Sequence, residues 1–312
     1  MRDRGVGAGG WIWGVALVGA CVAAGAVADT GPSRRGATAA VERAGPTLGP
    51  WPQPARDRWS LPLPAVRVLE RRTRHRDGRP LVVHAVLVDL CAGGLRMRAT
   101  APDEAFRSVP AFADSVSALV AINGDYFDVG PPSPLGPACG NGRWWATRDD
   151  PRYECLVAGG RALGLRIADV HESRLRADPR VTDVVSAAEH IVRRGRVTLS
   201  PYIVHAGRHP RAGLGLTADG RTLVLAVADG RRGGSVPSVG ATSEELGAIL
   251  VSLGVDDGAR LDGGGSATLW VRGLGVVNHP SDGFPRRVAN HLALVADPGA
   301  AVPPVCSARS HP

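Results

Sequence analysis

Three apolar runs in this sequence each end in an acid or amide that is followed directly by glycine, and this pattern constrains the fold most. The runs end at Asn123-Gly124, at Asp229-Gly230 and at Asp262, where three glycines follow. If the runs are neighbouring strands of one sheet, their polar ends gather on one edge, where open α/β sheets bind ligands. The alternative is ordinary turn chemistry, because Asn-Gly and Asp-Gly are common turn dipeptides.

The rest of the chain supports an α/β fold class, with a single mixed-sheet domain and flanking helices over residues 65–298 and a C-terminal tail over 299–312. One helix is well signalled, since Thr242 and Glu245 form a capping box before a run with one apolar face. Glu245 can be explained by that box alone. The expected strands cover residues 81–90, 119–122, 161–167, 212–216, 222–228, 259–261, 266–271 and 288–295.

The N-terminus is typical of an export signal. Residues 1–28 combine two early arginines, an apolar stretch and a small-residue cleavage site, and residues 29–64 form a flexible spacer rich in Pro, Ala and Gly. We therefore expect a secreted or envelope-associated protein with no stable membrane span after cleavage. A transmembrane anchor and lipidation at Cys21 are the alternatives.

Signal cleavage would remove Cys21 and leave four cysteines, an even number that suggests two disulfides in an exported chain. The local choice joins Cys139 to Cys155, and Cys91 with Cys306 would then hold the C-terminal tail. Free buried cysteines are the alternative.

The net charge of +8 suggests nucleic-acid binding, but all 37 basic residues are arginines and no lysine is present. This bias is typical of GC-rich coding, and no nucleic-acid-binding motif accompanies it, so we expect no nucleic-acid partner. The absence of lysine also excludes a P-loop lysine and Schiff-base catalysis.

Other catalytic patterns are weak. The run after Asp262 lacks the second glycine of a nucleophile elbow, which disfavours a serine hydrolase. His205 and His209 are four residues apart, but nearby prolines disfavour a helix that would present both to a metal. The other histidines have no partner at a suitable spacing. We expect no cofactor and no metal.

The motifs "AINGDYF", "VADGRR", "GATSEEL", "ARLDGGGSATLWV" and "RRVAN" occur in this order. Together they resemble the phosphodiester glycosidase family from about Leu81 to Ala296. The resemblance implies hydrolysis of a sugar-1-phosphodiester in an envelope or extracellular glycoconjugate. Asp125 stands where the family more often has glycine.

The resemblance implies the following site. The catalytic candidates are Asp262, Asp229 and Glu245, and the substrate-binding candidates are Asn123, Gly124, Asp125, Arg211, Gly263, Gly264, Gly265, Ser266, Arg286 and Asn290. A carboxylate would act as nucleophile or base, arginines would hold the departing phosphate, and the glycines would clear space for backbone donors. A non-catalytic binder of an anionic glycopolymer and a metal-dependent phosphodiesterase are the alternatives.

Overall fold

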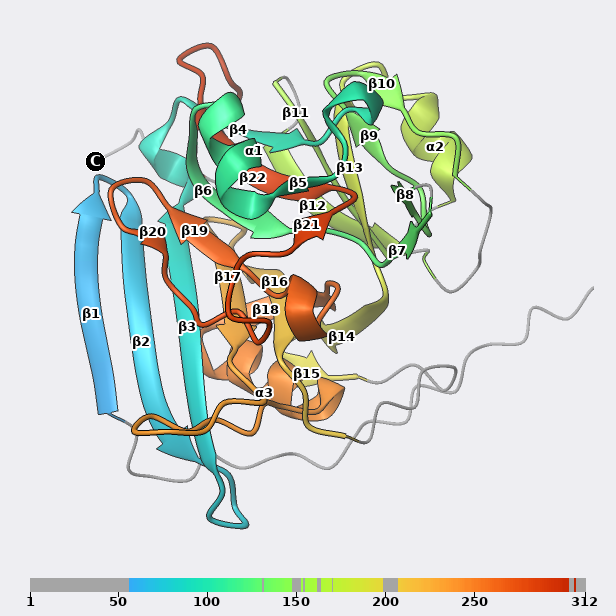
Figure 1. The fold of residues 1–312 in the computed structure, drawn as a ribbon. Helices are drawn as coiled ribbons and strands as arrows, with labels where there is room; N and C mark the ends of the chain where they lie inside the picture. The colour runs from blue at the N-terminus through green and yellow to red at the C-terminus, as the bar shows by residue number, and fades with distance from the viewer. Residues whose placement is uncertain are drawn as a thin grey trace, which may run out of the picture. The chain divides into compact units, whose positions relative to one another are not determined.

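The structure is a computed structural model of the chain. It describes residues 56–130, 132–147, 153, 155–161, 164–169, 171–198, 207–302 and 306 (Figure 1).

Three antiparallel sheets dominate these residues. The first has eight strands in the order β1 (Arg56–Leu63), β2 (Val66–Arg74), β3 (Pro80–Asp89), β17 (Thr222–Ala228), β16 (Arg211–Thr217), β18 (Val255–Arg260), β14 (Glu189–Arg193) and β15 (Arg196–Val197). The second has five, in the order β20 (Gly275–Val276), β19 (Leu269–Val271), β6 (Ala118–Asn123), β22 (His291–Ala296) and β4 (Leu95–Ala99).

The third sheet also has five strands, in the order β10 (Arg143–Trp144), β9 (Cys139–Gly140), β13 (Asp183–Ala187), β11 (Cys155–Gly160) and β12 (Gly164–Asp169). Two short pairs join β5 (Arg107–Ser108) to β21 (Arg287–Val288), and β7 (Phe127–Val129) to β8 (Pro132–Pro134). The α-helices are α1 (Val109–Ser115), α2 (Glu172–Arg176) and α3 (Ser243–Ser252), and single 3-10 turns cover Leu90–Ala92, Pro102–Glu104 and Gly264–Ser266.

The prediction of an α/β domain with flanking helices is wrong, because the described residues are mostly β-strand and their strand pairs are antiparallel. Central strands of the large sheet are covered on both faces. In β3, Val86 and Val88 pack in the main core, whereas Ala85 and Leu87 belong to the cluster that includes Leu246 of α3. The continuous apolar runs in the sequence therefore reflect burial on both faces of these strands. Strands of a parallel sheet are also buried on both faces, so the two kinds of sheet have similar sequences.

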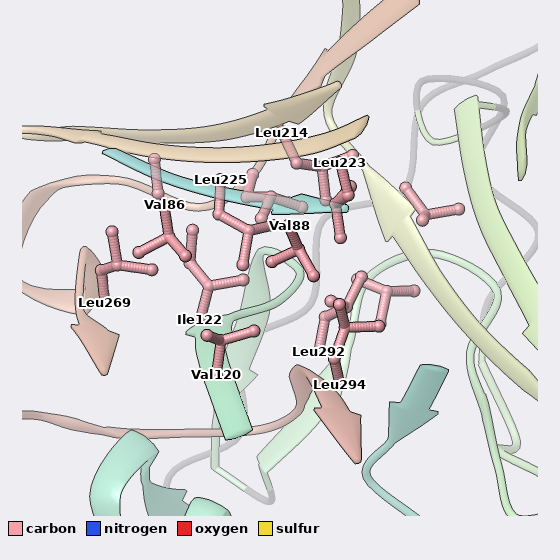
Figure 2. Close-up of a cluster of buried hydrophobic side chains, with 14 of the residues drawn as sticks. Val86, Val88, Val120, Ile122, Leu214, Leu223, Leu225, Leu269, Leu292 and Leu294 are labelled. Atoms are coloured by element: carbon pink, nitrogen blue, oxygen red, sulfur yellow. The ribbon is translucent and has the colours of Figure 1, made fainter. Parts of the chain in front are cut away.

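The main core lies between the large sheet and the second sheet. Figure 2 shows Val86, Leu214 and Leu225 of the large sheet close to Ile122 and Leu292 of the second sheet. Each of these five side chains is completely buried. This packing fixes the two sheets against one another, so residues at the ends of their strands can meet.

The capping box predicted at residues 242–245 is confirmed at the start of α3. The Thr242 hydroxyl accepts a hydrogen bond from the Glu245 N–H, and the Glu245 carboxylate accepts one from the Thr242 N–H. Leu246 and Leu250 are buried against the large sheet. This helix is the longest in the described residues, and it covers one face of that sheet.

The predicted spacer ends earlier than residue 64, since β1 occupies residues 56–63 and pairs with β2. Most of β1 is exposed, so its sequence lacks the apolar pattern of a core strand. The predicted signal peptide (residues 1–28), Cys21 and the start of the spacer lie outside the described residues. No helix within the described ranges is long and apolar enough to cross a bilayer.

The predicted bond between Cys91 and Cys306 is confirmed, with Cα atoms 5.3 Å apart. The predicted bond between Cys139 and Cys155 is wrong, because both thiols are buried and neither is in a disulfide. β13 lies between the strands that carry them, with Cys139 opposite Val184 and Cys155 opposite Ala187. Two strands with one strand between them are about 9.6 Å apart, so the two cysteines are too far apart to form a disulfide.

We predict that loss of the Cys91–Cys306 bond destabilises the fold, since it closes a loop of 215 residues. The chain-entropy model gives about 5 kcal/mol for a loop of this length. The double variant Cys91→Ser, Cys306→Ser should unfold at a lower urea concentration than the oxidised wild type. Reductant should lower the midpoint of the wild type but not that of the double variant. Equal midpoints for the oxidised wild type and the double variant would contradict this role.

Candidate active site

Two of the predicted acids lie at the same edge of the large sheet, where strands β17 and β18 end. β17 and β18 both pair with β16, and both run antiparallel to it. Asp229 follows the end of β17, Asp262 comes two residues after the end of β18, and Arg211 begins β16 between them. Asp229 and Asp262 are therefore brought to one edge, as expected. Asn123 ends β6, which belongs to the second sheet, so the expectation of three neighbouring strands in one sheet is wrong.

Asn123 connects the two sheets at this edge. Its side-chain nitrogen donates to the backbone oxygen of Asp262 at 2.9 Å, and its side-chain oxygen accepts from the Thr268 N–H at 3.1 Å. The Asp262 N–H in turn donates to the backbone oxygen of Gly124 at 3.1 Å. Asn123 is completely buried, so these bonds are shielded from water. The amide thus holds the backbone at both ends of the glycine-rich segment.

Asn290 holds the next two residues of the Asn-Gly-Asp motif. Its side-chain oxygen accepts from the Asp125 N–H at 2.9 Å, and its nitrogen donates to the Asp125 carboxylate at 2.7 Å. A Cβ atom on Gly124 would lie 2.3 Å from Oδ1 of Asn290, so only glycine fits there. Burial raises the pKa of Asp125 well above its usual value, and the charge of Asp262 adds to the rise. Burial thus favours the protonated form of Asp125.

Asp262 is a half-buried carboxyl group beside Asp125. Its Oδ1 accepts from the Gly263 N–H at 2.7 Å. Burial raises the pKa of Asp262 to about 6, although Ser266, the Gly263 N–H, Arg286 and Arg260 each favour the charged form. A carboxyl group with a pKa close to neutrality suits acid–base or nucleophilic catalysis.

Arg260, the second residue of the quoted "ARLDGGG" segment, lies completely buried next to Asp262. Its Nε donates to Glu189 at 3.3 Å, and one terminal nitrogen bonds to the hydroxyl of Tyr126. The other terminal nitrogen has no hydrogen-bond partner among the described residues. A buried guanidinium with an unused donor can bind an anionic ligand. The sequence patterns gave this arginine no role.

Arg211 adds a second buried cation. Its side chain donates to the backbone oxygens of Ala241 and Gly207 at 3.1 and 3.2 Å. Burial lowers the pKa of Arg211, and the charge of Arg260 lowers it further. Two guanidinium groups held this close repel each other, and a bound anion would relieve that repulsion.

The three glycines after Asp262 are explained by close packing. A Cβ on Gly263 would lie 2.7 Å from the backbone oxygen of Pro210, and one on Gly265 would lie 2.3 Å from Arg286. Gly264 has a φ of +59°, a conformation that favours glycine. The N–H groups of Gly263 and Gly264 donate to Asp262 and Pro210. The expectation that these glycines present donors to an anion is therefore not met at Gly263 and Gly264.

Exposed arginines surround the glycine turn. Arg286 forms an ion pair with Asp282 at 2.7 Å and packs against Gly265. Arg231, which also went unassigned from sequence, has a φ of +56° and brings its guanidinium within 3.6 Å of the Cβ position of Gly264. Its "Asp-Gly-Arg" motif was a signal that could have identified it. Both guanidinium groups thus lie beside the glycine turn that follows Asp262.

Comparison with known proteins identifies the family. A family model for phosphodiester glycosidases matches residues 117–295, more than half of the chain. The chain belongs to the phosphodiester glycosidase family. This membership agrees with the resemblance carried by the motifs and supports hydrolase activity at a general level.

Two solved structures share the fold of this chain. The catalytic domain of zebrafish N-acetylglucosamine-1-phosphodiester alpha-N-acetylglucosaminidase aligns with a TM-score of 0.60 at 19% identity, over 77% of this chain and 87% of that one. A Synechocystis protein aligns with a TM-score of 0.58 at 14% identity, over 77% of this chain and 64% of that one. Both likenesses show a shared fold.

A sequence relative is the SPbeta prophage-derived protein YomE of Bacillus subtilis. It is 38% identical over 87 residues, which cover 28% of this chain and 13% of YomE. The chain thus spans a small part of that relative's length.

Glu245 and Asp229, both catalytic candidates of the phosphodiester glycosidase motifs, occupy different surroundings from Asp262. The Glu245 carboxylate binds Arg208 at 2.6 Å and His75 at 3.1 Å in addition to its capping bond. Burial alone would raise the pKa of Glu245, but hydrogen bonds from His75, Arg208 and the Thr242 N–H lower it to about 2. This network holds the Glu245 carboxylate at the start of α3.

Asp229 is completely buried, and β16 separates its strand from that of Asp262. Two strands that are separated by one other strand lie about 9.6 Å apart. Its carboxylate accepts from the His279 N–H at 2.9 Å and from Arg232 at 3.3 Å, and it lies 3.3 Å from Nε2 of His84. Asp229 thus neighbours the Asp262 site without sharing its contacts.

We predict that Gly124→Ala destabilises the fold and disorders the site, because its Cβ would overlap the side chain of Asn290. Forced overpacking of this kind typically costs about 1–3 kcal/mol, measured as a lower urea midpoint. Gly233→Ala is the matched control, since a Cβ at Gly233 meets no atom within 4 Å. Wild-type stability in Gly124→Ala would show that Asn290 can move aside.

Proposed function

We propose that this chain is an exported hydrolase that cleaves the glycosidic C1–O bond of a sugar-1-phosphodiester in an envelope or extracellular glycoconjugate. The observation that carries the proposal is the position of Asp262 beside the buried cation Arg260, with Arg211 next to it. A carboxyl group beside paired cations suits a substrate whose reacting carbon becomes positive while its leaving group becomes negative.

The leaving group determines what such a site must supply. A departing phosphate is already a weak base, so stabilising its charge matters more than protonating it. The unused donor of Arg260 and the guanidinium groups of Arg211, Arg231 and Arg286 supply positive charge for that purpose. Arg286 would have to share its guanidinium with Asp282, with which it pairs.

The two carboxyl groups would then have different tasks. Asp262, which ionises near pH 6, acts as the nucleophile or as the base for water. Burial raises the pKa of Asp125 and favours its protonated form, which would donate a hydrogen bond to a sugar hydroxyl. Asn290 and Asn123 hold the two acids in place through the bonds described above.

We predict that hydrolysis in ¹⁸O-labelled water places the label in the released sugar. Attack at C1 leaves the phosphate with its original oxygen, whereas attack at phosphorus would add a labelled oxygen to it. The purified protein would be incubated with a small panel of sugar-1-phosphodiesters, and both products would be examined by mass spectrometry. Label in the phosphate would identify a phosphodiesterase instead. Binding without hydrolysis of any substrate would identify a non-catalytic binder.

We also predict that Asp262→Asn lowers kcat/KM by roughly 10⁴-fold, as loss of a catalytic carboxylate does in other hydrolases. In the wild type, kcat/KM should rise through pH 6 to a plateau, because the ionised form is the active one. The exposed turn residue Asp219 provides the matched control Asp219→Asn, which should keep wild-type activity. Wild-type kcat/KM in Asp262→Asn would move the carboxylate role elsewhere.

The same substitution should not weaken the fold. A carboxyl pKa raised from 3.8 to about 6 means that the native state binds the proton more tightly than the unfolded state does. Stability therefore decreases as the pH rises from 4 to 6, and Asp262→Asn should be at least as stable as the wild type at pH 8. A lower thermal midpoint for Asp262→Asn at pH 8 would contradict the pKa shift.

A further inference from the structure

His84, Asp229 and His279 form a cluster that no sequence spacing predicts. His84 lies in β3, Asp229 follows the adjacent strand β17, and His279 belongs to the loop after β20. The register places His84 opposite Val227, two residues before Asp229. Nothing in the proposed hydrolysis uses the two histidines.

The donor atoms are spaced as the ligands of one ion would be. Nε2 of His84 lies 3.3 Å from Oδ2 of Asp229, and Nδ1 of His279 lies 3.7 Å from the same oxygen. All three atoms are within 4.8 Å of one another. Ligands about 2.1 Å from a tetrahedral ion are about 3.4 Å apart, so small movements would suffice to bind one.

The surroundings suit a site that is closed on one side and open on the other. The side chains of His84 and Asp229 are 5% and 0% exposed, whereas that of His279 is 59% exposed. Asp229 is also held by its own neighbours, since its Oδ1 accepts from the His279 N–H and its backbone oxygen accepts from Ser238. These bonds orient Asp229 and leave Oδ2 directed toward the histidines.

We propose that His84, Asp229 and His279 bind one divalent transition-metal ion of the zinc type. Two imidazoles and one carboxylate are a donor set that such ions prefer, and three protein ligands leave a position for water or another oxygen ligand. The site is separate from Asp262, and its existence does not depend on the proposed hydrolysis.

Arg232 is the competitor for this site. One of its terminal nitrogens lies 3.3 Å from the same Oδ2 of Asp229. An arginine and two histidines around a buried aspartate can also be a simple neutralising network, in which no metal takes part. The ion would have to displace the Arg232 guanidinium, whose side chain is 23% exposed and can turn toward solvent. This competition makes the proposal testable.

The test is isothermal titration of the metal-stripped full chain with ZnCl₂, with bound zinc counted by elemental analysis after dialysis. We expect one zinc per chain for the wild type and at least about 100-fold weaker binding for His279→Ala, which removes an exposed ligand. Arg232→Ala should bind zinc about tenfold more tightly, because the competing cation is gone. His171→Ala, which removes an exposed histidine of α2's N-terminus, is the control and should bind as the wild type does.

Circular dichroism of each variant would verify folding, and His84→Ala provides a second ligand deletion. The absence of stoichiometric zinc in the wild type would overturn the proposal, as would unchanged binding in the folded His279→Ala variant. Tighter binding in Arg232→Ala together with loss in His279→Ala would support it. Zinc binding is measured without a substrate. Its absence would therefore overturn the metal site and leave the proposed hydrolysis untouched.

Discussion

The bonds of the buried Asn123 amide are the interaction on which the site depends. One side chain binds the backbone of Asp262 on one side and that of Thr268 on the other, and so fixes both ends of the glycine-rich turn. Its strand belongs to the second sheet, whereas Asp262 follows a strand of the large sheet. The packed core between those sheets holds the amide in register with its partners. Leaving a buried amide without hydrogen-bond partners costs free energy, so these bonds hold the arrangement in place.

Burial then determines the chemistry that the site can perform. The same desolvation raises the pKa of Asp262 to about 6, raises the pKa of Asp125 well above its usual value and lowers the pKa of Arg211. Glu245 is also partly buried, yet its pKa is lowered to about 2 because donors from His75, Arg208 and Thr242 saturate its oxygens. Two acids of the same family motifs therefore have opposite properties, and the difference comes from hydrogen-bond partners rather than residue type.

Sequence patterns predicted the local features well. The capping box of α3 and the strands β3, β6, β16 and β17 follow from local patterns within a few residues, whereas β2, β4, β11, β13 and β14 were not predicted. The fold class was predicted wrongly, because an apolar strand covered on both faces has the same sequence in an antiparallel sheet as in a parallel one. The disulfide between Cys139 and Cys155 was predicted wrongly because closeness in sequence does not reveal that β13 lies between their strands.

The sequence by itself determined which residues can do chemistry: the acids after the strands, the glycines that must follow Asp262 and the motifs that place the chain in its family. Only the tertiary structure decided which of those residues meet. It brought Arg260 to Asp262 and Arg231 to Gly264, placed Glu245 at a helix terminus and gathered His84 and His279 around Asp229. The physical reason is that contacts between strands far apart in the chain depend on sheet order and register, which no local spacing encodes.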